Sequence, residues 1–121
     1  MIADRILILA GGLAGAAGVG LSAAAAHAGG GNVGTAASFL LMHAPVLVAS
    51  GHLKANAVLR TGSLVVLVGL LLFCGDLLLR AYAGTRLFPM AAPIGGTAMI
   101  LGWLMIAGSA FTLVRVEPDR P

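Results

Sequence analysis

The chain has 121 residues, of which 60% are hydrophobic and only 9% are charged, and its mean hydropathy is +1.05. A soluble domain carries roughly a quarter charged residues, so this composition excludes an ordinary water-soluble protein and indicates an integral membrane protein. The net charge of +3 needs no nucleic-acid partner, because a few arginines that meet anionic lipid headgroups beside membrane helices account for it.

Four apolar stretches are long enough to cross a bilayer. Each has close to the ~20 residues that a helix needs to span a hydrocarbon core of about 30 Å. Little chain remains outside them, so we expect one domain, residues 1–121. The predicted fold is an all-α membrane protein, a four-helix antiparallel bundle of two hairpins with a polar, disordered tail over 115–121. The predicted helices cover about Ile6–Ala26, Thr35–Leu53, Thr61–Tyr82 and Ile94–Val114.

The distribution of basic residues predicts an orientation. An even number of helices places both termini on one side of the membrane. Cytoplasmic flanks retain positive charge during insertion, so the side with more Lys and Arg is expected to be cytoplasmic, and that is the side of both termini. It carries Arg5, Lys54, Arg60, Arg115 and Arg120, against Arg80 and Arg86 on the other side.

Residues 6–26 repeat small side chains, among them Gly11, Gly15 and Gly18. Small residues at helical spacing let membrane helices approach closely. We expect this surface to pack on the other helices of the same chain, with a homodimer contact as the alternative. Residues 6–26 could also be read as a cleaved secretory signal ending at Ala26-His27-Ala28. We prefer a retained membrane helix, because the n-region of such a signal would have no net charge and the apolar run is long for a signal.

The second and third stretches contain the polar residues that stand out. Pro45 removes a backbone hydrogen bond in mid-helix, so a bend is expected just after His43, and Thr35 or Ser38 is expected to cap the helix start. Asp76 and Arg80 are four residues apart and share a helix face, which predicts an ion pair in the outer half of the membrane.

The fourth stretch follows a connection that Pro89 and Pro93 are expected to keep non-helical until Ile94. A second close-packing surface is predicted on this helix at Gly95, Gly96 and Gly102. Gly75 of the third helix is also expected to be a packing residue. Trp103 lies near mid-membrane, where its N–H is expected to find a carbonyl or a serine. Cys74 is expected to be a small buried thiol.

Four strings follow one another in an order that resembles a known family. They look like the small four-helix inner-membrane proteins called domain of unknown function 423, whose eukaryotic relative is transmembrane protein 256. The resemblance covers nearly the whole chain and implies a multi-pass protein of the bacterial inner membrane; the family has no established activity. The strings are Leu21-Ser-Ala-Ala-Ala-Ala-His27, Thr35-Ala36 with His43-Ala44, Gly69 to Phe73 with Gly75 and Leu77, and Pro93-Ile-Gly-Gly96 with Gly102-Trp103.

The chain departs from the family pattern at several polar positions, and this weakens any chemical role for those positions. Cys74 and Asp76 stand where the family has serines, and Pro45 and Leu78 stand for leucine and tyrosine. The remaining differences are Ser22, Ala24 and Ala25 for Gly, Phe and Gly, and Phe39 with Leu40 for a Tyr-Gln pair.

His27 and His43 match the family pattern and are the first candidates for a functional role. A shared metal or haem site is the sharpest hypothesis for them. Their expected depths differ by something on the order of 10 Å, however, and zinc prefers three or four ligands. We therefore expect hydrogen bonding between helices, with no metal and no cofactor. For Asp76 and Arg80 we prefer a local ion pair over a proton relay or an anionic-lipid site.

No catalytic site is expected, since the sequence has no phosphate-binding glycine loop followed by Lys, no Cys-x-x-Cys and no nucleophile with a paired base. The favoured function is a non-enzymatic accessory or structural subunit that packs with itself or a larger membrane complex. Its expected partners are membrane lipids and a protein partner or second copy, without nucleic acid. The alternative is a binder or transporter of a lipid or quinone at the His43 and Pro45 region, and an intramembrane enzyme is a weaker third.

Overall fold

The structure is a computed structural model that describes residues 1–53 and 56–113. Lys54, Val114 and the predicted polar tail, with its two arginines, lie outside the described residues. The described chain is all-helical and has no strand, and four of its helices are long and apolar enough to span a membrane. The predicted fold class is thus confirmed. The elements are α1 (Ile2–Ala28), α2 (Gly31–His52), α3 (Ala57–Tyr82), α4 (Ala91–Gly108) and a short 3-10 helix, η1 (Ser109–Thr112).

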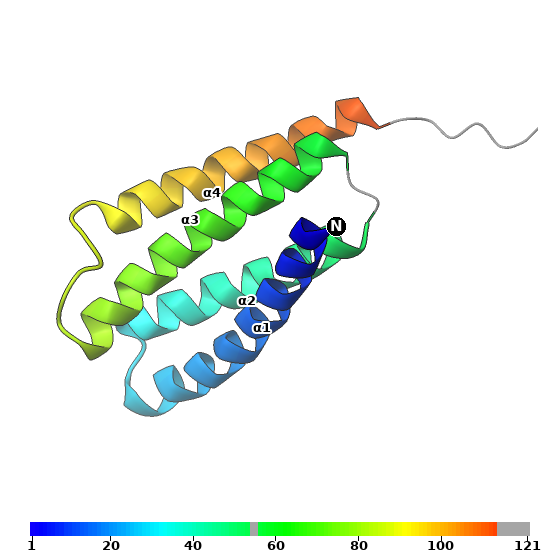
Figure 1. The fold of residues 1–121 in the computed structure, drawn as a ribbon. Helices are drawn as coiled ribbons and strands as arrows, with labels where there is room; N and C mark the ends of the chain where they lie inside the picture. The colour runs from blue at the N-terminus through cyan, green and yellow to red at the C-terminus, as the bar shows by residue number, and fades with distance from the viewer. Residues whose placement is uncertain (54–55, 114–121) are drawn as a thin grey trace, which may run out of the picture.

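The helices form two hairpins, α1 with α2 and α3 with α4 (Figure 1). The start of α1 and the end of α4 lie at the same end of the bundle, and the turns within the two hairpins lie at the opposite end, here called the far end (Figure 1). Which end faces the cytoplasm is not tested by the fold, and the predicted orientation stays a prediction.

All four helices begin three or four residues earlier than the sequence indicated, and the starts of α2 and α4 change the predicted connections. The first turn is only Gly29 and Gly30, so α2 starts at Gly31 and passes through Pro45 as a continuous helix. Helix α4 starts at Ala91, which makes Pro93 its third residue. The N–H groups of a first helical turn have no partner within the helix, so a proline there removes no hydrogen bond.

The predicted caps of the second helix are wrong. Thr35 and Ser38 lie inside α2, and their hydroxyls donate to the carbonyls of Gly31 and Gly34 one turn earlier, at 3.2 and 3.0 Å. A side-chain cap is found on α3 instead, where the Asn56 Oδ1 accepts from the Leu59 N–H at 2.9 Å.

Glycines set the close approach of the helices within each hairpin. A Cβ at Gly11 of α1 would lie 2.9 Å from the Ala44 carbonyl oxygen of α2, and one at Gly18 would lie 2.7 Å from Leu41. At Gly15 the contact is looser, 3.6 Å from the Ala44 Cβ. The hairpin of α1 and α2 is therefore held by direct backbone packing.

The second hairpin is packed in the same way, through one face of α4. A Cβ at Gly95 would lie 2.7 Å from the Gly69 carbonyl oxygen, and one at Gly102 would lie 2.8 Å from the Gly62 carbonyl oxygen. The predicted packing roles of Gly75 and Gly96 are not seen among the described residues, because a Cβ at either would meet none of them within 4 Å. Gly96 lies about 100° around the helix from Gly95 and so is off the helix face that packs directly on α3.

The two hairpins meet mainly along α2 and α3. The shared core contains Leu40 and Leu47 of α2, Leu67 and Leu70 of α3, and Leu7 of α1. Among the described residues α1 touches α3 only lightly and does not touch α4. The bundle is therefore open along one side of α1.

Candidate functional site

One of the buried polar residues is His43, in the middle of α2. Its side chain is 2% exposed. The Nδ1 lies 2.7 Å from the Phe39 carbonyl oxygen, and the Nε2 lies 3.1 Å from the Trp103 Nε1 of α4. An indole N–H can only donate, so these partners assign the neutral tautomer with the proton on Nδ1.

This contact joins helices that are otherwise apart in the bundle. His43 and Trp103 each lie 12 residues after the first residue of a helix, Gly31 and Ala91, and these helices run in the same direction. At 1.5 Å per residue both are about 18 Å from the far end. The expected carbonyl or serine acceptor for Trp103 is thus wrong, since the acceptor is a histidine ring from the other hairpin.

The structure does not bring the two candidate histidines together. His27 is exposed in the last turn of α1, next to the first turn, whereas His43 is buried in mid-bundle. In the part of the chain that the structure describes, no three His, Cys, Asp or Glu side chains gather as metal ligands would. Both His43 ring nitrogens are already engaged, so a ligand there would have to break one of two protein contacts.

Asp76 is the second buried polar residue, near the far end of α3. It is 1% exposed, and its Oδ2 lies 2.9 Å from the Arg80 Nη2, so the predicted ion pair is present. Its Oδ1 accepts from the backbone N–H of Leu87 at 2.9 Å, a contact that no sequence pattern indicated. Asp76 therefore anchors the loop between α3 and α4 onto α3.

Two more polar contacts link the hairpins near the N-terminal end. The Asp4 Oδ1 of α1 lies 3.3 Å from the Arg60 Nε of α3. The hydroxyls of Ser50 and Ser63 are both buried and lie 2.9 Å apart, and Ser63 also reaches the Leu59 carbonyl oxygen at 2.8 Å. Sequence reasoning missed both pairs, because their partners are far apart along the chain.

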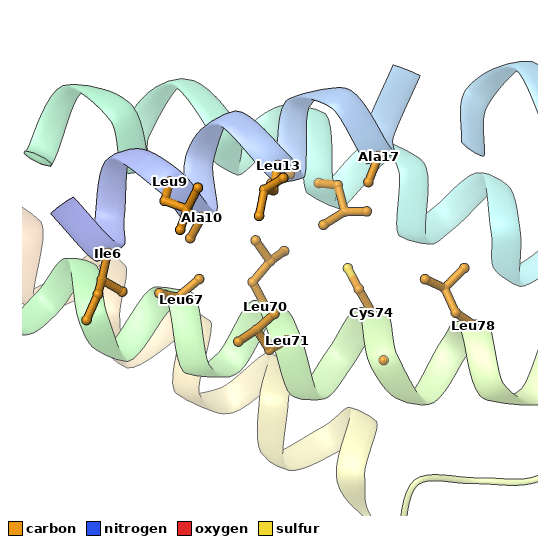
Figure 2. A pocket seen from close by; sticks show the side chains of 13 residues that line it. Ile6, Leu9, Ala10, Leu13, Ala17, Leu67, Leu70, Leu71, Cys74 and Leu78 are labelled. Carbon is orange, nitrogen blue, oxygen red and sulfur yellow. The ribbon is translucent and has the colours of Figure 1, made fainter. Parts of the chain in front are cut away.

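An apolar groove of about 500 Å³ lies between α1 and α3 on the open side of the bundle. Leu9, Leu13 and Ala17 project from α1 towards Leu70 and Cys74 of α3 (Figure 2). Leu40 of α2 also lines the groove, and none of its lining residues in the described part of the chain is charged. Cys74 is 3% exposed here, in agreement with a buried thiol.

A second hollow, of about 590 Å³, lies at the far end between α3, α4 and the connecting loop. Its lining is mixed, with Arg80 and Arg86 as the charged residues and Phe73 and Ile100 among the apolar ones. His43 and Pro45 line neither hollow.

Comparison with known proteins gives two matches. A family model described as a protein of unknown function (DUF423) matches residues 14–96. The UPF0382 membrane protein of Haemophilus influenzae is 31% identical over 81 residues, which are 65% of this chain and 65% of that protein. The match thus spans just under two thirds of the relative's length. No solved structure matches this chain.

Proposed function

The chain belongs to the DUF423 family of proteins of unknown function, and we propose that it is a non-enzymatic accessory or structural subunit in the membrane. The resemblance inferred from the sequence strings is thereby confirmed. The relative is named a membrane protein, and the four candidate spans of this chain also indicate a multi-pass membrane protein. We further propose that the chain lies in the bacterial inner membrane with both termini in the cytoplasm.

The groove between α1 and α3 carries this proposal. Apolar side chains facing lipid need no explanation in a membrane, but a concave apolar surface between two helices is a natural seat for another helix. Leu9 and Leu13 on its rim are 64% and 62% exposed. A helix of a second copy or of a larger protein seated there would complete the open side of the bundle.

The buried polar groups support a role without catalysis. Each ring nitrogen of His43 has a protein partner, and each oxygen of Asp76 lies 2.9 Å from a protein nitrogen. Polar groups buried in a membrane protein are costly unless paired, and these pairs join helices or fix a loop. Their geometry accounts for their presence as structural contacts.

Native mass spectrometry of the tagged protein, extracted gently from its own membranes, tests the proposal. A fixed oligomer or a stoichiometric larger partner is expected. Gly75→Leu should abolish this oligomer or complex, because Gly75 lines the groove and a Cβ added there would meet no described residue within 4 Å. Gly12→Leu is the matched control, since Gly12 is equally open and does not line the groove. A lone chain, or equal behaviour of both variants, would contradict the proposal.

The groove also favours one second candidate, a binder or transporter of a lipophilic molecule such as a lipid or quinone. Its site would be the groove, because His43 is enclosed between α2 and α4 and Pro45 lines no hollow. The same spectrum separates the two functions. A lone chain that carries a reproducible lipid or quinone mass, lost in Gly75→Leu, would favour the binder.

The proposed orientation has its own test. A cysteine introduced at Asn32, which is exposed beside the first turn, should be labelled from outside the cell by a membrane-impermeant thiol reagent. The native Cys74 is buried and should add little background. Labelling from the cytoplasmic side alone would reverse the orientation.

A further inference from the structure

We propose that the hollow at the far end binds an anionic phospholipid, with the phosphate at Arg80, Arg86 and the start of α4 and an acyl chain along Phe73 and Ile100. This proposal is independent of the accessory-subunit function, since it uses a different surface from the groove between α1 and α3.

The depth of the hollow fits a lipid. Its lining runs along α4 from Ala92 to Ile100, eight residues and therefore about 12 Å. The charged lining residues belong to the end of α3 and to the loop, whereas Phe73 and Ile100 lie farther into the bundle. A headgroup at the charged end would thus direct its hydrocarbon chain along the apolar part.

Gly96 keeps the apolar part of this hollow open. It lines the hollow, and a Cβ at this position would meet nothing within 4 Å. Its neighbour Gly95 lies about 100° around the helix and is packed against α3, with the Phe73 backbone nitrogen 2.6 Å from where its Cβ would be. The empty space at Gly96 is therefore free for a ligand and is not used for helix packing.

The charge at the far end is complementary to a phosphate. Asp76 neutralises Arg80, and Arg86 makes no ion pair among the described residues. No other acidic residue occurs between Arg5 and Leu113 in the sequence. Helix α4 adds its positive dipole end, and its N-cap residue Met90 makes no side-chain cap.

Asp76 also places the second arginine. Arg86 directly precedes Leu87, whose backbone N–H is bound by the Asp76 carboxylate. The carboxylate thus holds the loop against α3 while its other oxygen pairs with Arg80. Asp76 is accordingly a positioning residue for the site and needs no contact with the lipid.

The test uses detergent-purified, delipidated full-length protein and native mass spectrometry with phosphatidylglycerol and phosphatidylcholine of identical acyl chains. Phosphatidylglycerol is expected to bind with a several-fold preference. An arginine near an anionic lipid is worth about 1 kcal/mol, so Arg86→Gln should lower that preference about fivefold, and Arg86→Lys should keep most of it. Gly96→Leu should weaken both lipids alike, because it fills the apolar part. The matched control is Arg5→Gln, an exposed arginine at the other end of the bundle.

Three outcomes would overturn the proposal. The first is equal binding of the two lipids to the unmodified protein. The second is an equal loss of preference in Arg5→Gln and Arg86→Gln, which would show general surface charge in place of a site. The third is full displacement of the lipid by millimolar glycerol phosphate, which would assign the hollow to a free anion. Unchanged helicity and Trp103 fluorescence of each variant would show that it is folded.

Discussion

Gly95 and Gly96 are neighbours in α4 and allow a matched test of the helix packing. A Cβ at Gly95 would lie 2.6 Å from the Phe73 nitrogen and 2.7 Å from the Gly69 carbonyl oxygen, whereas one at Gly96 meets nothing within 4 Å. Ordinary contact begins at 3.4 Å, so Gly95→Ala must part α3 and α4 by about 0.8 Å. A gap of that size forfeits roughly a quarter to a half of the dispersion energy of the separated contacts.

The free energies follow from this difference. Alanine gains up to about 1 kcal/mol of helix propensity over glycine at both positions, so this term cancels when the two variants are compared. Overpacking costs about 1–3 kcal/mol. We therefore expect Gly95→Ala to be about 1–3 kcal/mol less stable than Gly96→Ala, and Gly96→Ala to be at least as stable as the unmodified protein.

The measurement is an unfolding titration in mixed micelles, with the SDS mole fraction raised and loss of helical circular dichroism recorded. Each variant is compared with the unmodified protein under the same conditions. Equal midpoints for Gly95→Ala and Gly96→Ala would refute the packing that we describe between α3 and α4. If Gly96→Ala were less stable than the unmodified protein, the space beside Gly96 would have to be occupied by other protein atoms.

Three further predictions use the same titration. Ser63→Ala should cost about 0.5–1.5 kcal/mol, because it leaves the buried Ser50 hydroxyl without its partner, and no change would argue against that contact. Trp103→Phe, combined with His43→Ala in a double-mutant cycle, should give a coupling energy of about 0.6 to 1.7 kcal/mol, while purely additive effects would deny the hydrogen bond. Cys74, the one cysteine of the chain, should react with a maleimide far more slowly in mild detergent than in SDS, and similar rates would contradict its burial.

Sequence alone was sufficient for the helices and for one ion pair. Apolar stretches of spanning length are a local property, and so is the four-residue spacing that pairs Asp76 with Arg80. The helix ends were less accurate. The early start of α4 at Ala91 was missed because Pro93 suggested a boundary, although a first helical turn accepts proline.

The contacts between hairpins could not be predicted. His43 with Trp103 and Asp4 with Arg60 join residues 60 and 56 positions apart, and nothing local marks such partners. Glycine spacing likewise shows where a helix is narrow without showing which of its faces meets a neighbour. Gly96 was assigned to packing for this reason, although it faces a hollow.

The division of contacts between and within the hairpins has a consequence for biosynthesis. Each hairpin is closed by backbone packing at its own glycines, whereas His43 with Trp103, Ser50 with Ser63, and Asp4 with Arg60 hold one hairpin to the other. The hairpin of α1 and α2 can therefore leave the translocon as a finished unit before α3 is made. Until the second hairpin inserts, His43 and Ser50 of the first hairpin would lack their hydrogen-bond partners Trp103 and Ser63. A ribosomal pause after residue 56 should therefore be tolerated. Deletion of α3 and α4 should instead lead to degradation of the first hairpin.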